Sequence, residues 1–572
     1  MVQLSEKTLA QLCLEASRQY GEHTAFAMFQ DDKLNEDRRV SYKMLGFRAR
    51  QIALLLKQLG VASGDRVLLL SENCPEWPLA YFGIALSGTV SVPLLTGFSA
   101  NQVQHIMGHA EVSAIIASRR MAGKIEQIPP GIPLIFLDSI TTSENSAEIA
   151  VSSNGSEKRL PLPTPNGELP QCKSGDLATI IYTSGTSGNS KGVMLSNANL
   201  IACVESSLFV AKFSPADRWL SVLPLAHSYE CSIGMLYPVM SGSSVTYLDR
   251  PPSPSVLLTA ARLVRPTAML TVPLLIEKIY RSGIGPKLQS SSLYRFPLTR
   301  PLATRVAGRK LNAALGGKIR FFGIGGAPLA AEVEQFLRGA RFPYAMGYGL
   351  TEAAPLLAGG APFTYPYRST GALLPGVELR IAPRETDTDG ANADIGVQHS
   401  VDSGSGAKGP GAERNAAFVG EIQARGPNVM MGYYRNEEQT REAYTDDGWL
   451  RTGDLGRIDS NNKLFICGRS KFLILGSGGE NIYPEEIEGL LGSSPSVEDA
   501  LVYSGGNGEL VAMVKLTDAA KAAAGNMEQT LEELRTWANK KLANFSRLSK
   551  ITIRHEPFEK TPTMKIKRRL YI

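Results

Sequence analysis

One segment of the chain combines glycines, hydroxyl side chains and a lysine in a pattern that suits phosphate binding. Residues 182–192 read YTSGTSGNSKG and follow an apolar stretch at 178–182, which predicts a strand leading into a loop. The glycines allow close backbone approach, the hydroxyls can donate to phosphate oxygens, and the lysine supplies a cation. The segment is not a Walker A loop, because serine precedes the lysine and glycine follows it. A polar surface turn is the alternative. The residues expected to bind phosphate are Thr183, Ser184, Gly185, Thr186, Ser187, Gly188 and Lys191.

Four further motifs of similar character follow toward the C-terminus. GYGLTE occupies 347–352 and GWLRTGDLG occupies 448–456, while GRSK at 468–471 is followed by GSGGENIYPEEIE at 476–488. The last motif, TPTMKIKR, occupies 561–568. Each motif contains charged or hydroxyl side chains, and these lie either in a glycine-containing turn or in a basic stretch. A single motif of this kind is weak evidence for a function, but five of them in this order are a specific signal.

Together these five motifs resemble those of the acyl-adenylate-forming (AMP-binding) superfamily, which includes acyl- and aryl-CoA synthetases, peptide-synthetase adenylation domains and beetle luciferases. Two more segments are similar to the long-chain fatty acyl-CoA synthetase branch: LPLAHSYE at 223–230 and VPLLIEKIY at 272–280. The chain departs from the common pattern at Ser190, Asn197 and Met564, where many members have proline, histidine and glycine. Every charged group that the chemistry requires is present.

The resemblance implies a two-step reaction. A carboxylate attacks the α-phosphate of ATP to give acyl-AMP and pyrophosphate, and the thiol of coenzyme A then displaces AMP. In the first step two anions meet, and unit charges 4 Å apart interact by about 4 kcal/mol at an effective dielectric of 20. By family position Thr351 binds a phosphate oxygen, Glu352 holds Mg²⁺, and Lys565 bridges the carboxylate and the α-phosphate. Without the resemblance, Lys565 would be taken for part of a solvated basic tail.

The nucleoside and the acyl group need other side chains. The resemblance places Asp454 and Arg469 at the ribose hydroxyls and the ring of Tyr348 against adenine. It assigns His227 to the acyl pocket near the reacting carboxylate, with Glu230 on the same helical face. A capped turn, a surface ion pair and ordinary core packing would also explain these residue types one by one. The small residues that complete the nucleotide site are Gly325, Gly326, Ala327, Gly347 and Gly349.

The second step is expected to use another face of a small C-terminal domain. In relatives this domain rotates about a hinge, whose position Lys471 occupies, and brings a glycine-rich segment to the site. Gly478, Gly479 and Glu480 would then line the path of coenzyme A. An exposed strand lysine is the alternative for Lys471.

The elements that must position these residues alternate along the chain. From about residue 40, short apolar strand patterns such as 65–70 alternate with helical patterns such as 48–59. This succession predicts an α/β fold, with a large N-terminal domain of sheets layered with helices and a small mobile α+β C-terminal domain. The expected domains are 1–468, which binds AMP and the acyl group, and 469–572.

The composition is that of a globular chain with a large core. Of 572 residues, 43% are hydrophobic and 20% are charged, and the formal net charge of +6 is small for this length. The charge therefore gives no support for nucleic-acid binding. Two stretches, 141–175 and 385–415, are polar or rich in small residues and are expected to be surface excursions or disordered insertions.

Cysteine usage and the N-terminal segment favour a cytoplasmic protein. None of the six cysteines forms a CxxC pair or adjoins a histidine at ligand spacing, so reduced packing residues are expected. The N-terminal segment lacks the basic start and apolar run of a signal peptide. No apolar run reaches the ~18 residues of a membrane span.

One segment carries many cations and no acids. Between Glu277 and Glu332 there is no aspartate or glutamate, whereas ten lysines and arginines occur, interleaved with leucines and aromatic residues. Such a segment could bind the anionic inner face of a membrane, or it could bind the phosphates of coenzyme A. A solvated basic face is the alternative.

The expected partners are therefore a fatty acid, ATP and coenzyme A, with Mg²⁺ as cofactor. Two alternatives of the same class are a ligase for a medium-chain or aryl acid and an enzyme that loads an acyl carrier protein. An alternative of another class is a non-catalytic lipid- or nucleotide-binding relative. The charged residues that argue against a non-catalytic relative are Lys191, Glu352, Asp454, Arg469 and Lys565. No motif encodes the preferred chain length.

Overall fold

A computed structural model describes most of the chain. At three places it describes the backbone alone: residues 397–400, 475 and 481. No helix in the part of the chain that the structure describes is long and apolar enough to cross a membrane. The described residues are 1–140, 148–183, 190–383, 397–400, 419–475, 481–505, 509–523, 525–561 and 566–572.

The larger of two main sheets joins a parallel half to an antiparallel half. It has fourteen strands among the described residues. Pairing is parallel from β15 through to β1, while β2 and the strands beyond β15 are antiparallel to their neighbours. In sheet order the strands are β19 (Val397–Ser400), β18 (Glu378–Ala382), β20 (Gly420–Arg425), β22 (Leu450–Ile458), β23 (Lys463–Arg469), β17 (Gly371–Leu373), β16 (Leu356–Gly359), β15 (Tyr344–Gly349), β14 (Phe321–Ile324), β13 (Ala268–Thr271), β11 (Arg218–Leu220), β12 (Ser244–Leu248), β1 (Thr24–Gln30) and β2 (Lys33–Ser41).

The smaller main sheet has a parallel centre and antiparallel edges. Pairing is parallel from β9 to β6 and antiparallel outside them. In sheet order its strands are β21 (Gly432–Tyr433), β10 (Lys191–Ser196), β9 (Leu177–Thr183), β4 (Val90–Leu94), β3 (Arg66–Leu70), β5 (Val112–Ala117), β6 (Leu134–Phe136), β7 (Glu148–Ser153) and β8 (Ser156–Pro161).

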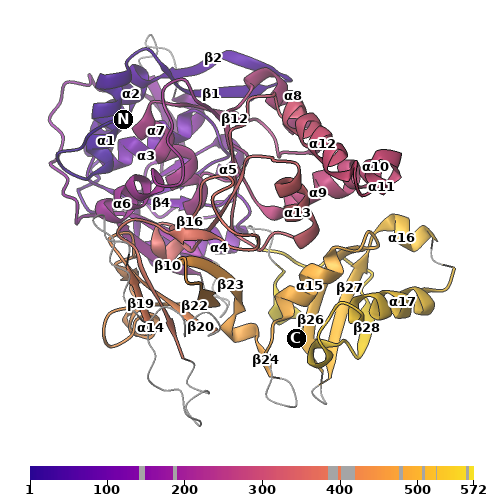
Figure 1. Cartoon of the computed structure of the whole chain (residues 1–572). Helices are drawn as coiled ribbons and strands as arrows, with labels where there is room; N and C mark the ends of the chain where they lie inside the picture. Colours follow the sequence, from indigo (N-terminus) through magenta and orange to yellow (C-terminus); the bar gives the residue numbers. More distant parts are fainter. Residues whose placement is uncertain are drawn as a thin grey trace.

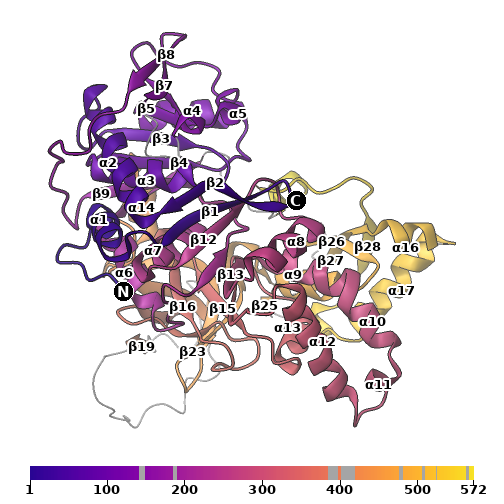
Figure 2. The same cartoon turned by 90° about the horizontal axis from the view of Figure 1, so that it is seen from above.

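Helices lie between the two sheets and cover their outer faces (Figures 1 and 2). One apolar core joins the inner helices to both sheets, and two others bind the outer helices to one sheet each. The inner helical elements are α1 (Leu9–Tyr20), α2 (Tyr42–Gln58), α3 (Glu76–Leu86), α6 (Asn197–Ser207), η2 (Glu230–Leu236) and α7 (Tyr237–Ser241). Those outside the smaller sheet are α4 (Ala100–Ala110) and α5 (Arg119–Ala122). Those outside the larger sheet are α8 (Pro254–Val264), α9 (Pro273–Ile279), α10 (Gly285–Ser290), α11 (Ser292–Arg295), α12 (Arg300–Ala314) and α13 (Ala331–Gly339).

The side chains of β3 show how the layers arise. Successive side chains of a strand point to opposite faces. Val67 and Leu69 belong to the core between the sheets, whereas Leu68 and Leu70 belong to the core beneath α4. A strand covered on both faces reads as a continuous apolar run, which is how this segment appears in the sequence.

The C-terminal part of the chain forms a small unit with its own apolar core. A three-stranded sheet, in the order β26, β27 and β28, carries helices that include α15 and α17. Its elements are β24 (Ile474–Leu475), β25 (Asn481–Ile482), α15 (Pro484–Gly492), β26 (Val497–Ser504), β27 (Leu510–Leu516), α16 (Asp518–Ala523), α17 (Met527–Asn539) and β28 (Lys550–Ile553).

The structure confirms the expected α/β class and corrects one detail. The stretch 141–175 is not wholly an excursion, because its described part contains the hairpin of β7 and β8 at the edge of the smaller sheet. Ile149 and Val151 of β7 are buried in the main core. Nearly all of 385–415 lies outside the described residues. The expected boundary between 468 and 469 falls at the end of β23 and stays a prediction.

Candidate active site

The predicted phosphate loop connects two strands of the smaller sheet. β9 ends at Thr183 and β10 begins at Lys191, and the antiparallel register places these two residues opposite each other. This hairpin fixes the lysine beside the ends of the loop. The loop residues Ser184, Gly185, Thr186, Ser187 and Gly188 lie outside the described residues, so their phosphate contacts stay predictions.

A tyrosine joins the predicted phosphate lysine to the predicted metal ligand. The ammonium of Lys191 lies 4.9 Å from the centre of the Tyr433 ring, and the Tyr433 hydroxyl donates to Oε1 of Glu352 at 2.9 Å. β21 brings Tyr433 here, because it pairs with β10 beside Lys191. Burial and the charge of Glu352 raise the pKa of Tyr433, so the phenol stays a donor. Sequence analysis missed this residue.

Glu352 suits a magnesium ion that is held mainly by nucleotide phosphates. Its carboxylate is half-buried, and the bond from Tyr433 fixes one of its oxygens. Within the described ranges no group of three or more His, Cys, Asp or Glu side chains could hold a metal by itself. Mg²⁺ at phosphate sites usually takes one or two carboxylates and completes its shell with phosphate oxygens and water. A single positioned carboxylate therefore fits, and an ion there would offset phosphate charge.

Thr351 links the GYGLTE turn to the LPLAHSYE segment. It begins η4 (Thr351–Ala353), and its hydroxyl lies 3.2 Å from the hydroxyl of Ser228. The turn requires a glycine at 349, because a Cβ on Gly349 would come within 1.8 Å of the Pro355 carbonyl oxygen. Close backbone packing therefore holds the hydroxyl of Thr351 and the carboxylate that follows it.

His227 caps the helical turn that carries Glu230, because its carbonyl accepts the N–H of Cys231 at 2.9 Å, and the expected common face of the two side chains stays a prediction. Helical backbone starts only after His227, whose Nδ1 accepts the backbone N–H of Tyr229 at 3.2 Å. Glu230 opens η2, is 1% exposed, and accepts a hydrogen bond from the Ser221 hydroxyl at 2.6 Å. Burial raises the pKa of Glu230 to about 8, so its carboxyl group is mostly protonated at neutral pH.

Three residues assigned to the nucleoside lie together. Asp454 of β22 and Arg469 of β23 are cross-strand partners, with Nε of the arginine 3.0 Å from Oδ1 of the aspartate. The hydroxyl of Tyr348 donates to Oδ2 of Asp454 at 2.9 Å. Burial and the charge of Asp454 raise the pKa of Tyr348. The aromatic ring proposed to face adenine is thus held by its own hydroxyl.

The GIGGAP loop presents bare backbone at the carboxyl end of β14. Gly325 donates its N–H to the Thr271 carbonyl at 3.2 Å, and Gly326 adopts a φ of +86° that favours glycine. Gly326 and Ala327 are exposed. Because β14 pairs with β15, this loop lies beside the strand that carries Tyr348. Ligands of α/β sheets bind at such carboxyl ends.

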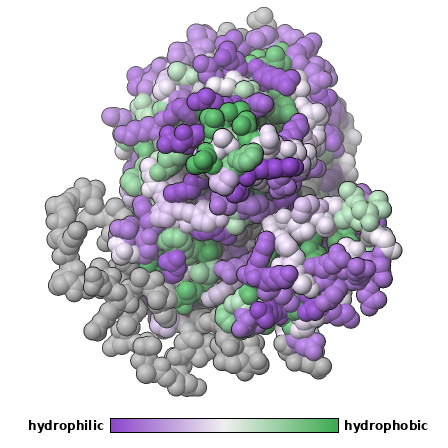
Figure 3. All heavy atoms as spheres, turned by 45° about the vertical axis from the view of Figure 1, so that its right-hand side comes forward, coloured by the Kyte–Doolittle hydropathy of each residue, from purple (hydrophilic) through white to green (hydrophobic). Residues whose placement is uncertain are grey.

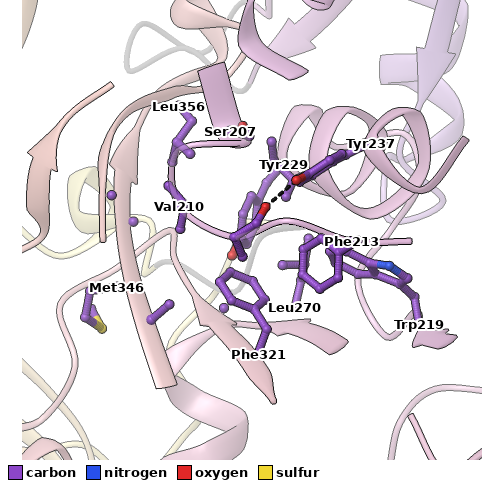
Figure 4. A pocket seen from close by; sticks show the side chains of 16 residues that line it. Ser207, Val210, Phe213, Trp219, Tyr229, Tyr237, Leu270, Phe321, Met346 and Leu356 are labelled. Atoms are coloured by element: carbon purple, nitrogen blue, oxygen red, sulfur yellow. Dashed lines mark hydrogen bonds between the residues drawn. The ribbon is translucent and has the colours of Figure 1, made fainter. Parts of the chain in front are cut away.

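An apolar cavity with little free volume lies behind the GYGLTE turn. Figure 4 shows side chains from several elements converging on it, and Gly347 contributes to its wall. Its free volume is about 30 Å³, which holds about two water molecules. The Phe213 ring lies 4.5 Å from Trp219, 5.4 Å from Tyr237 and 5.6 Å from Phe321, centre to centre. An acyl chain therefore fits only if these rings move.

The cavity adjoins the predicted reaction centre through Tyr229. Tyr229 is one of its lining residues, and the neighbouring Ser228 contacts the Thr351 hydroxyl. His227 is not among the lining residues, so its place in an acyl pocket stays a prediction.

Lys471 lies two residues after the end of β23, in η6 (Ser470–Phe472). Burial and the neighbouring Arg469 and Arg569 lower the pKa of Lys471 to about 8. The backbone N–H of Arg469 donates to Oε2 of Glu485 at 3.1 Å, which ties the end of β23 to α15. The hinge assigned to Lys471 thus lies near the contact between β23 of the larger sheet and α15 of the C-terminal unit, and its function stays a prediction.

The backbone on both sides of residues 562–565 is anchored to the C-terminal domain. Before them, Nζ of Lys560 lies 2.8 Å from Oδ1 of Asp499. After them, Nη1 of Arg568 lies 2.6 Å from Oε1 of Glu488. The arginine is largely buried, with 9% of its side chain exposed. The segment that carries the predicted catalytic lysine is therefore fastened at each end.

Four predicted residues of this domain lie outside the described residues. They are Lys565 and the three residues of the coenzyme A path, Gly478, Gly479 and Glu480. Their functions stay predictions.

Comparison with known proteins identifies the family. The family described as AMP-binding enzyme matches residues 13–434. Fatty acyl-CoA synthetase A of Dictyostelium discoideum is 28% identical over 95% of this chain and 85% of its own. Long chain acyl-CoA synthetase 1 of Arabidopsis thaliana is 30% identical over 92% of this chain and 84% of its own.

The solved structures with a similar fold include O-succinylbenzoate coenzyme A synthetase of Bacillus subtilis in complex with ATP and magnesium ion. Its TM-score is 0.72 at 23% identity, with 98% of each chain covered. At this identity the likeness shows the fold. The two sequence relatives and the family match together establish that the chain belongs to the AMP-binding enzyme family, where it is similar to long-chain fatty acyl-CoA synthetases.

Proposed function

We propose that this protein is an ATP-dependent long-chain fatty acid–CoA ligase that uses Mg²⁺. One observation carries the proposal. Gly347 lines the apolar cavity, whereas Tyr348 contacts Asp454 and Thr351 lies beside Glu352 and Ser228. A single short segment therefore separates an apolar cavity, which would admit an acyl chain once its aromatic rings move, from groups suited to a nucleotide.

In the first step a carboxylate oxygen attacks the α-phosphorus, and the bond to pyrophosphate breaks. Lys191 and the Thr351 hydroxyl bind phosphate oxygens, while the carboxylate of Glu352 would hold a magnesium ion, which would offset phosphate charge. Lys565 lies between the two reacting anions and lowers their repulsion. Asp454 and Arg469 hold the ribose, so the nucleotide stays in place while the phosphate reacts.

In the second step the sulfur of coenzyme A attacks the acyl carbon, and AMP leaves. The C-terminal domain turns at Lys471, which removes Lys565 from the site and brings Gly478–Glu480 to it. The change of domain position explains why one small unit can serve two reactions with different residues.

Leucine at position 479 is expected to leave ATP–pyrophosphate exchange nearly intact and to block thioester formation, because the new side chain would fill the path of coenzyme A. Both half-reactions are measured for Gly479→Leu. Gly489→Leu is the control, since a Cβ at this exposed helical position of the same domain meets no atom within 4 Å. Equal loss of both half-reactions in Gly479→Leu would make Gly479 a structural residue.

The substrate class is tested by AMP release with acids of increasing chain length and with benzoate. Release that requires both coenzyme A and a long-chain acid is expected. Higher turnover with benzoate would point to an aryl ligase, and turnover only with acyl carrier protein would change the acceptor. Absence of acid-dependent pyrophosphate release would indicate a binding protein without activity.

The cavity is expected to set the chain-length profile through Phe213. Phe213→Leu replaces the ring that contacts three other aromatic side chains with a smaller side chain, so the preferred acid should become longer. Phe342→Leu is a matched control, because Phe342 is also buried and packs on Phe322 outside the cavity. Rates across saturated acids from eight to twenty carbons give both profiles. If the two variants shift alike, the cavity does not receive the chain.

The proposed partners are a fatty acid, ATP and coenzyme A. A long-chain fatty acid partitions into bilayers, so the proposal places the enzyme reversibly at an anionic membrane.

A further inference from the structure

The helices at one edge of the molecule expose large apolar side chains. Leu298 is 96% exposed, Phe296 68% and Leu302 60%, and Leu293 and Val306 are exposed as well. They come from α11, α12 and the connection between them. Both cartoon views show α10, α11 and α12 projecting from the same side of the body (Figures 1 and 2).

One face of α12 alternates apolar and cationic side chains. Leu302, Arg305, Val306 and Arg309 are exposed and spaced at i, i+3, i+4 and i+7, which places them on one stripe of the helix. The opposite side contributes its buried residues, such as Leu311, to the core beneath. The stripe is therefore the solvent-exposed face of a helix whose opposite face is packed against the core.

Most cations of this acid-free segment have no carboxylate partner. Two do: Arg281 lies 3.0 Å from Glu332, and Arg320 lies 2.7 Å from Asp217. Both of these carboxylate partners come from outside the segment. Among the described residues, the remaining eight form no ion pair within 4.0 Å, namely Lys278, Lys287, Arg295, Arg300, Arg305, Arg309, Lys310 and Lys318.

We propose that the α11–α12 surface docks on an anionic lipid bilayer. This surface is defined by its exposed apolar and cationic side chains, Leu293, Arg295, Phe296, Leu298, Arg300, Leu302, Arg305, Val306, Arg309 and Lys310. Figure 3 brings this side forward and shows a hydrophobic patch bordered by hydrophilic side chains. The inference rests on the part of the proposed function that places the enzyme at a membrane.

The mixture of side chains favours a bilayer over other occupants. An interfacial helix buries apolar side chains at the boundary of headgroups and acyl chains and keeps its cations at the headgroups. The guanidinium carbon of Arg300 lies 4.6 Å from the centre of the Tyr294 ring. The pair thus combines an apolar aromatic ring with a charged group at its end. A nucleic acid would not require Leu298 and Phe296 to be exposed, and a second copy of this surface would repel the first by its cations.

Vesicle co-sedimentation tests the proposal without ATP or fatty acid, so its outcome is independent of the ligase activity. The protein should pellet with vesicles of phosphatidylcholine containing one third phosphatidylglycerol at low salt, and not with phosphatidylcholine alone. Binding should weaken as salt rises, because attraction between exposed charges is screened.

Two sets of variants separate the contributions. Arg305→Gln, Arg309→Gln and Lys310→Gln together should lower the partition coefficient about 100-fold at low salt. Leu298→Ser with Leu302→Ser should remove the binding that persists at high salt. The charge-matched control is Lys57→Gln, Lys158→Gln and Arg159→Gln, of which the last two lie on β8, far from α11 in Figure 2. This control should bind like the unmodified protein.

Three results would overturn the proposal. The first is pelleting of the charge variant at the level of the control. The second is a raised KM for coenzyme A in the charge variant with a water-soluble acid, which would assign the cations to substrate. The third is a change from dimer to monomer on sedimentation of Leu298→Ser with Leu302→Ser, which would make the surface an interface between copies. Failure of vesicle binding with intact acid-dependent AMP release would leave the ligase proposal standing.

Discussion

Replacing Lys565 with alanine is expected to abolish acyl-adenylate formation and largely spare thioester formation from supplied acyl-AMP. The first step joins two anions and needs a cation between them, whereas the second step starts from an adenylate that has already lost pyrophosphate. Loss of one positioned group that stabilises a charged transition state costs about 100- to 1000-fold in rate. Pyrophosphate exchange and the acyl-AMP to acyl-CoA reaction measure the two steps separately.

The tail that carries Lys565 also supplies the control. Lys567 is exposed, and its Nζ lies 3.3 Å from Glu559. Lys567→Ala removes one charge from the same tail but should change neither step by more than about twofold, since an exposed ion pair contributes little. If Lys565→Ala slows both half-reactions equally, the lysine is not specific to adenylation and the alternating use of the domain fails.

Glu352→Gln is expected to slow adenylation about 100-fold and to raise the Mg²⁺ concentration needed for half of the maximal rate. A neutral amide is a poor ligand for a hard cation, and the carboxylate is the only acidic group of its turn. The substitution keeps the size of the side chain and its contact with Tyr433, so the effect isolates the charge. Initial rates of pyrophosphate release over a range of Mg²⁺ concentrations give both numbers.

Tyr433→Phe distinguishes the metal ligand from its support. This variant keeps the carboxylate of Glu352 but removes the hydroxyl that donates to it at 2.9 Å. A loss of about tenfold is expected, with a smaller change in Mg²⁺ dependence, because the ligand remains but is less well oriented. An unchanged Mg²⁺ titration in Glu352→Gln would show that the metal is held elsewhere.

Elements with clear apolar patterns could be predicted from the sequence. The strand expected at 65–70 differs from β3 by one residue, since a buried strand is an unbroken apolar run. The helix expected at 48–59 begins earlier, at Tyr42 in α2, where the hydroxyl of Ser41 accepts the backbone N–H of Met44 at 3.2 Å. This cap lies ahead of the apolar repeat, so periodicity alone did not reveal it.

The hairpin of β7 and β8 could not be predicted in the same way. β8 is an edge strand with exposed and mostly polar residues, so its sequence resembles a loop. β7 contributes only a short apolar stretch, too short to distinguish from other local patterns. These residues form strands because they pair with the edge of the sheet. Such pairing involves residues distant in sequence, so it is not visible in the local pattern.

The candidate site likewise contains some residues that the sequence reveals and others that only the folded structure reveals. Motifs located Lys191, Glu352 and Asp454, because glycine-rich turns and charged residues are visible in order along the chain. Tyr433 was missed because its place depends on β21 pairing with β10, a contact between segments far apart in sequence. The burial that keeps Glu230 protonated is likewise a product of packing.

Under the proposed function, the small free volume of the apolar cavity has a consequence for how sharply the enzyme discriminates between acids. Moving one methylene from water into an open apolar space gains about 0.8 kcal/mol, or about fourfold in affinity. Here the aromatic rings around Phe213 already contact one another, so each added methylene must first separate contacts that the protein makes with itself. The gain per carbon is then smaller than fourfold. Selectivity should accordingly be graded across neighbouring chain lengths, so acids that differ from the preferred one by a single carbon should be activated at similar rates.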